Sequence, residues 1–472
     1  MIFNSIDFLF FIPVVILIYW YSNHSIQNLF LLLSSLFFYG FWDFRFLGLL
    51  ILSSIIDYMA GIQIENSYNN TRRRKLFLAF SLISNLGILG FFKYFNFFID
   101  NASTFLQFFG LHPSIQTLQI ILPLGISFYT FQTLSYTIDV YRGELKPVRN
   151  FIDFALYVSF FPQLVAGPIE RATRLLPQIQ SVRKWNFTQV QEGSFLILLG
   201  YFKKVFVADN IGDIVNSIYA MEDPSGSKIF IVLIAFFFQI YCDFSGYSDI
   251  ARGLSKWMGF ELMRNFNLPI FSVNVIDLWK RWHISLMSWF RDYVYIPLGG
   301  NKVSLRRQHV NNIFIFFVSG LWHGASWTFI IWGVYNGLLT SIYRILQPIL
   351  PKLGGDDNAL IYWSKYSIKA GFTFLLFVYS GIWFRGTSLE QGLHFTNNLF
   401  MEFGTWDNAL FMKVIRLVAL LLIIEFSQFR KNDEFSIFRW KLGFRVLLYL
   451  SMFYSILIMG NFNKNEFIYF VF

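Results

Sequence analysis

The chain has 472 residues, of which 55 % are hydrophobic and only 14 % charged, and its mean hydropathy is +0.50. This composition excludes a soluble globular protein, and the 61 phenylalanines together with the low charge exclude a disordered one. The formal net charge of +10 indicates cytoplasmic loops beside anionic lipid rather than a nucleic-acid site. The single cysteine, Cys242, excludes a disulfide framework and a cysteine-based zinc site.

Long apolar segments follow one another along the whole chain, as in a multi-pass membrane protein. The predicted spans are residues 5–21, 27–42, 46–63, 76–98, 119–138, 194–209, 229–245, 371–385, 408–426 and 444–461. Shorter or interrupted apolar pieces lie near residues 151–167, 283–298 and 311–345. We therefore predict an all-α fold of about ten or more transmembrane helices that surround these interrupted pieces.

No low-complexity linker and no internal repeat marks a second domain, so we predict one integral-membrane domain over residues 1–472. Its expected parts are peripheral spans within residues 1–138, a core within about 151–345, and C-terminal spans within 371–472.

Lysine and arginine residues predict the orientation of the spans, since basic loops stay in the cytoplasm. The basic run 72–75 follows the third span and is expected inside, which places the N-terminus outside. The basic stretch 246–310 is also expected inside. Residues 100–118, 211–227 and 387–407 carry no lysine or arginine and are expected outside. Counting forward leaves the C-terminus outside.

Residues 311–345 do not fit one ordinary span, because Gly320 and Gly324 interrupt them near their middle. We expect a re-entrant hairpin or two broken helices, with His323 near the turn and at membrane depth. Irregular backbone at that depth must be buried in protein or line a watery cavity. An ionisable group there favours a functional role, and a neutral, desolvated imidazole can act as a general base. The alternative is a core histidine that a backbone carbonyl satisfies.

His283 lies in an amphipathic segment that mixes indoles with basic groups. The residues concerned are Trp279, Trp282 and Trp289, and Lys280, Arg281 and Arg291. One interpretation is an interfacial helix, with tryptophan at the headgroup level and basic side chains touching lipid phosphates. The other is a cytoplasmic mouth that attracts an anionic cosubstrate and presents the imidazole of His283.

Several polar residues lie where lipid would not tolerate them, and we expect a structural polar core of Asp139, Asp243, Asp249 and Arg252. Asp249 and Arg252 are three residues apart and can meet on one helix face. The sequence holds no Walker A, Gly-x-Ser-x-Gly or His-Glu-x-x-His pattern and no familiar metal-ligand spacing. We therefore expect no bound metal.

Several stretches resemble the membrane-bound O-acyltransferase family, and most closely its bacterial branch of alginate and peptidoglycan O-acetylation proteins. They are LPLGISFYTFQ (122–132), IDVYRG (138–143), FFPQLVAGPI (160–169), YCDFSGYSD (241–249), WKRWHIS (279–285), WFRDYVYIPLGG (289–300) and GLWHGASW (320–327). The opening FLFFIPVV (8–15) and the closing FIYFVF (467–472) fit as well. The resemblance therefore covers essentially the whole chain.

The resemblance implies many membrane helices around slanted and re-entrant helices, pierced by a tunnel. It implies that His323 is the essential intramembrane histidine and that His283 is the second family histidine. It also implies a bacterial cytoplasmic membrane, acetyl-CoA or another acyl thioester as cosubstrate, no bound cofactor, and an extracytoplasmic SGNH-type acetyltransferase or a polysaccharide as partner.

Many relatives of this family carry a histidine where this chain has Asn336, and an amide cannot exchange a proton near neutral pH. A role for a third histidine is therefore in doubt. The candidate contacts to the donor or substrate are Lys280, Arg281, Arg291, Trp322 and Asn336.

These observations together predict acyl transfer. The donor enters from the basic cytoplasmic side, and His323 takes the proton of an acceptor hydroxyl that arrives from outside. The alternatives are a D-alanyl or longer-chain acyl transferase of the same family, or a multi-pass transporter or flippase that uses His323 in a proton relay.

Overall fold

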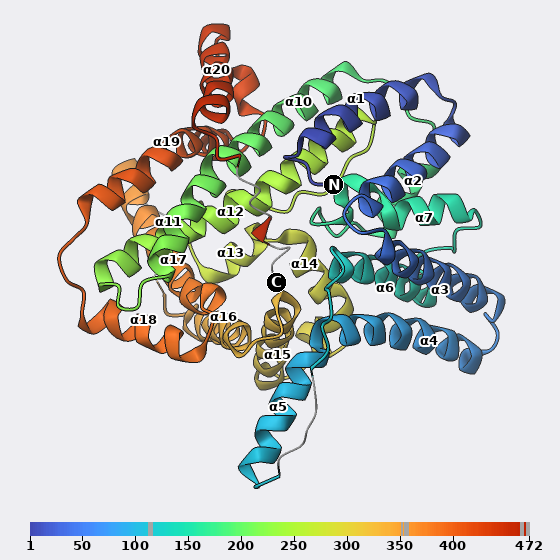
Figure 1. Ribbon diagram of the computed structural model, residues 1–472, viewed down its shortest axis with the longest axis horizontal. Helices are drawn as coiled ribbons and strands as arrows, with labels where there is room; N and C mark the ends of the chain where they lie inside the picture. Colours follow the sequence, from blue (N-terminus) through green and yellow to red (C-terminus); the bar gives the residue numbers. More distant parts are fainter. Residues whose placement is uncertain (112–116, 351–352, 354–357, 463–466, 469–472) are drawn as a thin grey trace. The chain divides into compact units, whose positions relative to one another are not determined.

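The computed structural model describes residues 1–111, 117–350, 353, 358–462 and 467–468, and over these ranges it holds helices and no strand (Figure 1). The predicted all-α class is confirmed. Six helical stretches of the described residues are long and apolar enough to cross a membrane: Phe44–Asn66, Thr71–Phe108, Gly226–Trp257, Trp327–Leu346, Ala359–Arg385 and Leu442–Met459. The chain is therefore a multi-pass membrane protein. Parts of the predicted outer segment 100–118 and of the closing motif 467–472 lie outside the described residues.

The contacts among residues divide the chain into two compact units. The first comprises Met1–Phe195 and Ile250–Met263, and the second comprises Leu196–Asp249 and Arg264–Phe472. The prediction of a single domain stays a prediction, and each unit is described by itself below.

The first unit is built from the N-terminal helices. They are α1 (Ile6–Tyr21), α2 (His24–Gly40), α3 (Leu47–Asn66), α4 (Thr71–Leu89), α5 (Phe95–Phe108), α6 (Ile126–Arg142), α7 (Phe151–Ser159), α8 (Phe161–Leu164) and α9 (Ala172–Gln180). A 3₁₀ turn at Phe44–Phe46 precedes α3, and a π-helical turn at Gly90–Tyr94 joins α4 to α5. Side-chain caps begin several of these helices, as when Asn23 accepts a hydrogen bond from the Ile26 N–H at the start of α2.

Helix α6 begins later than the predicted span at residue 119. Pro123 and Gly125 precede it, and Gly125 has a φ of +71°, which is left-handed and unfavourable for other residues. A Cβ at Gly125 would lie 2.6 Å from the carbonyl oxygen of Leu164. The tight approach of these two segments therefore places the helix start at Ile126.

Asp57 of α3 joins three helices of the first unit. Its buried carboxylate accepts hydrogen bonds from Asn85 Nδ2 of α4 at 2.9 Å and from Thr137 Oγ1 of α6 at 2.9 Å, and also from the hydroxyl of Ser81. Neutral donors thus satisfy the carboxylate inside an apolar bundle, where a buried carboxylate without hydrogen bonds would cost free energy.

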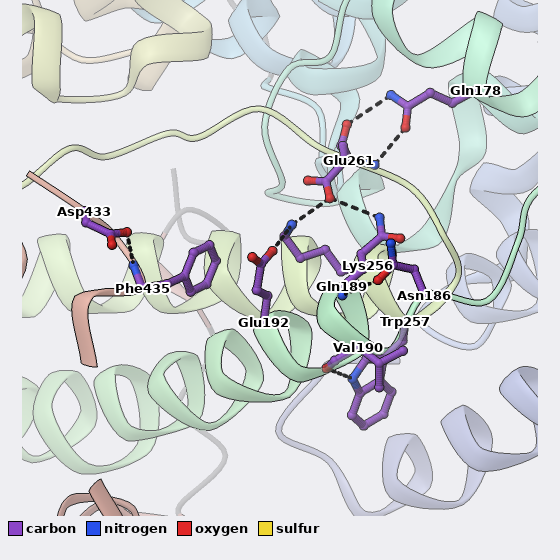
Figure 2. A network of polar contacts seen from close by, with 10 residues as sticks. All are labelled: Gln178, Asn186, Gln189, Val190, Glu192, Lys256, Trp257, Glu261, Asp433 and Phe435. Atoms are coloured by element: carbon purple, nitrogen blue, oxygen red, sulfur yellow. Dashed lines mark hydrogen bonds and ion pairs between the residues drawn. The ribbon is translucent and has the colours of Figure 1, made fainter. Parts of the chain in front are cut away.

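A polar cluster secures the chain after α12 in the first unit (Figure 2). Lys256 Nζ donates to Glu192 Oε2 at 2.9 Å and to Glu261 Oε1 at 2.6 Å. Gln178 of α9 donates to the Glu261 carbonyl at 3.1 Å and accepts from the Glu261 N–H at 2.7 Å. This cluster ties α9 and the start of α10 to the segment that follows α12.

The second unit holds the remaining helices. They are α10 (Phe187–Tyr201, shared with the first unit), α11 (Asp209–Tyr219), α12 (Gly226–Trp257, also shared), α13 (Val275–Arg281), α14 (Ile284–Phe290), α15 (Leu305–His323), α16 (Trp327–Leu346), α17 (Ala359–Arg385), α18 (Leu389–Met401), α19 (Asn408–Lys431) and α20 (Leu442–Met459). Short π or 3₁₀ segments lie at Phe202–Ala208, Pro269–Phe271, Arg291–Tyr295, Gly300–Lys302 and Ser436–Arg439.

Predicted spans in this unit are too short. The span 194–209 belongs to a helical run from Phe187 to Tyr219, and the span 229–245 belongs to α12, which continues to Trp257. The predicted outer segment 387–407 contains α18, and its position outside the membrane stays a prediction. Hydropathy ends the second of these spans before Asp249, but the buried ion pair of Asp249 with Lys203 lets α12 continue through that residue.

The predicted break within residues 311–345 is confirmed as a helical hairpin. Helix α15 ends at His323, α16 begins at Trp327, and the two pack against each other (Figure 1). A Cβ at Gly320 would lie 2.3 Å from the Phe329 carbonyl oxygen, and one at Gly333 would lie 2.2 Å from the Phe316 carbonyl oxygen. Glycine is thus needed for the close contact of the two backbones.

Candidate functional site

His323 is the last residue of α15 and is 5 % exposed. Gly324 follows it in an extended conformation, and Ser326 then caps α16 by accepting a hydrogen bond from the Thr328 N–H at 3.3 Å. The hairpin therefore turns immediately after the imidazole and fixes its position. The sequence prediction that His323 lies near this turn is confirmed.

Aromatic rings surround the imidazole of His323. The centroid of the imidazole lies 5.0 Å from the ring centroid of Trp322, 5.0 Å from that of Trp332 of α16 and 5.1 Å from that of Phe384 of α17. The last two contacts are edge-on, at 85° and 70°. Three helices of the second unit thus hold the ring within an apolar enclosure that limits the access of water.

A cavity of ≈ 30 Å³ adjoins His323, enough for about two water molecules. Its lining comprises Leu233, Phe236, Phe237, Ile240, Trp282, His323, Trp332, Phe377, Val378, Ser380, Gly381 and Phe384. Almost every lining group is apolar, so the cavity suits a small uncharged group rather than a charged one.

His283 is also buried, at 1 % exposed, between α13 and α14. Its φ of +45° is left-handed, a strained conformation for a residue with a side chain, and such strain often accompanies functional sites. Asn265 holds the following turn, because its carbonyl oxygen accepts from the Ile284 N–H at 2.9 Å. Asn265 Nδ2 in turn donates to the Ser248 hydroxyl at 3.0 Å.

Trp322 contacts both histidines. Its ring centroid lies 5.7 Å from His283 and 5.0 Å from His323, and His283 also packs edge-on against Phe244 at 4.6 Å. The structure thus brings together two histidines that are 40 positions apart in the sequence, both in contact with a single indole.

The tryptophans around His283 are core residues. Trp279, Trp282 and Trp289 are all buried, and Trp282 lines the His323 cavity. These indoles therefore do not face lipid headgroups, and the level of the segment in the membrane stays a prediction. Aromatic packing explains the difference, since Trp279 contacts Phe316, Trp332 and Phe377 edge-on at 5.0, 5.9 and 5.7 Å.

The basic candidates lie at the surface of the same segment. Lys280 is exposed. Arg281 Nε lies 3.0 Å from Asp277 Oδ1, and the exposed Arg291 lies 2.8 Å from Asp292. Their role in attracting an anionic cosubstrate stays a prediction.

Asn336 lies on α16, and its side chain donates to the Trp332 carbonyl at 2.8 Å. It is buried one turn beyond a residue that contacts His323. This local hydrogen bond orients the amide along its own helix, and contact with a substrate stays a prediction.

The expected structural polar core is distributed over both units. Asp139 of α6 and Arg252 are buried in the first unit. In the second unit, Asp243 Oδ1 lies 2.6 Å from Lys204 Nζ, and Asp249 Oδ2 lies 2.8 Å from Lys203 Nζ. The pairing of Asp249 with Arg252 stays a prediction.

Sequence reasoning missed Lys203 and Lys204 as members of this core. Lys204 also pairs with Asp209 at 2.9 Å, and its ammonium lies 4.3 Å from the centre of the Phe467 ring. Nearby, the Tyr241 hydroxyl donates to the carboxylate of Glu425. Two adjacent lysines inside the apolar run 194–209 were the available signal, because charged groups at that depth need partners.

Within the described ranges, no group of three or more His, Cys, Asp or Glu side chains is placed to hold a metal ion. The site offers a pair of imidazoles, an indole that contacts both, and a small apolar cavity. Such a set can accept or donate a proton away from bulk water.

Burial lowers the pKa of His283 from its ordinary value of 6.5 to about 3, and this residue lies outside the helices long enough to span. The folded protein therefore binds fewer protons at His283 than the unfolded chain between these two values. We expect the stability of the wild type to fall as the pH drops from about 6.5 toward 3. His283→Asn, which tolerates a left-handed backbone, should flatten this fall.

The measurement is the unfolding temperature in detergent at pH values from 4 to 8. Equal dependence in wild type and His283→Asn would contradict the prediction.

The chain is similar to known proteins over most of its length. Residues 16–384 match the model of "MBOAT, membrane-bound O-acyltransferase family". "Probable alginate O-acetylase AlgI" of Pseudomonas aeruginosa is 38 % identical over 439 residues, which cover 91 % of this chain and 82 % of that protein. "Peptidoglycan O-acetyltransferase" of Helicobacter pylori is 35 % identical over 429 residues, covering 83 % and 78 %. "Teichoic acid D-alanyltransferase" of Bacillus subtilis is 31 % identical over 240 residues, covering 48 % and 59 %.

Proposed function

Because the chain belongs to the membrane-bound O-acyltransferase family, we propose that this enzyme takes an acetyl group from cytoplasmic acetyl-CoA and delivers it for O-acetylation of an extracytoplasmic polysaccharide. The observation that carries the proposal is His323, buried at the tip of a helical hairpin beside a small apolar cavity. The family membership sets aside the alternative of a transporter or flippase.

In the proposed reaction His323 acts as the general base. One imidazole nitrogen takes the proton of the acceptor hydroxyl as the oxygen attacks the thioester carbonyl carbon. The carbon–sulfur bond then breaks, and the proton passes to the departing thiolate. No covalent acyl-enzyme is needed. The aromatic rings around His323 support this step, because excluding water prevents hydrolysis of the thioester.

The size and polarity of the cavity favour an acetyl group. Its ≈ 30 Å³ leaves room for only a small group, which favours a short acyl chain over a long one. A D-alanyl group would bring an ammonium into a cavity whose described lining carries no carboxylate, which is costly. A D-alanyl transferase remains the second candidate on the strength of the similarity to the Bacillus subtilis protein.

The donor is proposed to approach the surface of α13 and α14. Lys280, Arg281 and Arg291 are basic groups that would attract the phosphates of acetyl-CoA. Approach of the donor from the cytoplasm agrees with the proposed topology, in which the protein lies in the bacterial cytoplasmic membrane with residues 246–310 inside and both termini outside. An extracytoplasmic SGNH-type acetyltransferase is the proposed partner that completes transfer to the polysaccharide.

The proposal is tested with purified protein in lipid nanodiscs, given either acetyl-CoA or a D-alanyl-carrier thioester together with a polysaccharide acceptor. We expect release of free CoA thiol and acceptor-dependent O-acetylation. Consumption of the D-alanyl thioester alone would overturn the choice of donor, and consumption of neither with a folded protein would overturn the proposed activity.

A further inference from the structure

A groove between α16 and α17 is separate from the His323 cavity and has no part in the chemistry proposed above. Its volume is ≈ 660 Å³, the size of a typical small-ligand site. Leu339, Ile342 and Leu346 of α16 line it, as do Phe372 and Leu376 of α17. Ile342 is 49 % and Phe372 63 % exposed, so the groove opens outward between two helices that can each cross the membrane.

Aromatic residues mark the level of one end of this groove. Trp363 of α17 lies 5.4 Å from Tyr362 and 5.5 Å from Tyr366, and the Arg430 guanidinium lies 5.2 Å from the Trp363 ring centre. Clusters of tryptophan and tyrosine with a basic side chain are typical of the membrane–water interface. The first turns of α17 therefore lie at the headgroup level.

The lining changes from polar to apolar along α17. Lys369 lines the groove one turn after Tyr366, and Thr373, Phe372 and Leu376 follow it. Seven residues separate Lys369 from Leu376, a helical rise of about 10 Å into the hydrocarbon layer. The groove thus has a cationic end at the interface and an apolar end at depth.

We propose that this groove binds one acyl chain of an anionic membrane phospholipid. The phosphate lies beside Lys369, and the chain follows α17 toward Leu376. Lys365 of α17 and Arg344 of α16 add positive charge near the same end of the helix pair. Basic pockets between transmembrane helices select anionic headgroups, and Tyr343 and Gln347 in the lining add polar groups at that end.

The bound chain also shares a wall with the reaction cavity. Leu376 lines the groove, and the next residue, Phe377, lines the His323 cavity and contacts Trp282 at 5.0 Å. Filling the groove therefore supports the helix that closes the cavity. This inference concerns a separate site and holds whether or not the acyl group is acetyl.

The test compares phosphatidylglycerol with phosphatidylethanolamine by native mass spectrometry and by thermal unfolding of the detergent-solubilised protein. The wild type should retain phosphatidylglycerol about fivefold better, because one lysine near anionic lipid contributes roughly that factor. Lys369→Gln should abolish this preference. Ile342→Trp and, independently, Leu346→Trp should obstruct the groove and lower the retention of both lipids.

Matched controls lie outside the lining. Lys413→Gln removes an exposed charge from α19, and Ile368→Trp enlarges a side chain of α17 that is 72 % exposed. Both control variants should retain phosphatidylglycerol as well as the wild type does. Equal retention by the wild type, Lys369→Gln and the tryptophan variants would overturn the proposal. Displacement of the lipid by acetyl-CoA would overturn it too, and would identify the groove as a donor path.

Discussion

His323→Ala is expected to lower acetyl transfer by about 1,000-fold while the protein still inserts in the membrane. A positioned general base contributes roughly 10²–10⁴ to such a step, and the aromatic enclosure leaves little room for water to replace it. His323→Gln should be equally inactive, because an amide can hydrogen-bond but cannot take the proton. The measurement is acceptor-dependent release of CoA thiol by purified protein in nanodiscs.

His309→Ala provides the matched control for this prediction. His309 lies on the same helix, α15, but outside the residues that line the cavity. Its alanine variant should keep activity within a few-fold of the wild type. Residual activity above a tenth of the wild-type rate in His323→Ala would contradict the assignment of His323 as the base.

The hairpin could be predicted from the sequence because its signal is local. Two glycines close together in an apolar run indicate a broken helix, and the structure ends α15 at the histidine between them. The close packing of Gly320 against Phe329 explains why the interruption holds. A histidine flanked by apolar residues at membrane depth was therefore identifiable as a candidate without any three-dimensional information.

The remainder of the site depends on contacts between distant residues. The segment with His283 has the composition of an interfacial helix, yet its tryptophans are buried, and Trp279 packs against α15, α16 and α17. Likewise, Lys204 and Asp243 are 39 positions apart, so hydropathy does not show that they pair. Both errors arise because a one-dimensional pattern shows which groups need partners but not which partners they find.

Lys204→Met is expected to destabilise the enzyme by about 3–5 kcal/mol, because it leaves two carboxylates buried without their shared ammonium. Lys204 Nζ lies 2.9 Å from Asp209 and 2.6 Å from Asp243, and all three side chains are almost fully buried. The Asp243 carboxylate also accepts a hydrogen bond from the Ile468 N–H at 2.7 Å, so losing the lysine disturbs the anchoring of residues 467–468 as well. Thermal and detergent-induced unfolding measure the loss.

Removing the stranded charges should reverse most of this loss. In the triple variant with Asp209→Asn and Asp243→Asn added to Lys204→Met, the amides carry no charge, and residue 243 can still accept from Ile468. The exposed Lys413 serves as control, and Lys413→Met should change stability by less than about 0.5 kcal/mol. Two results would contradict this account: Lys204→Met as stable as Lys413→Met, or a triple variant no more stable than Lys204→Met. Either would mean that the pairing of Lys204 does not stabilise the helix within the apolar layer.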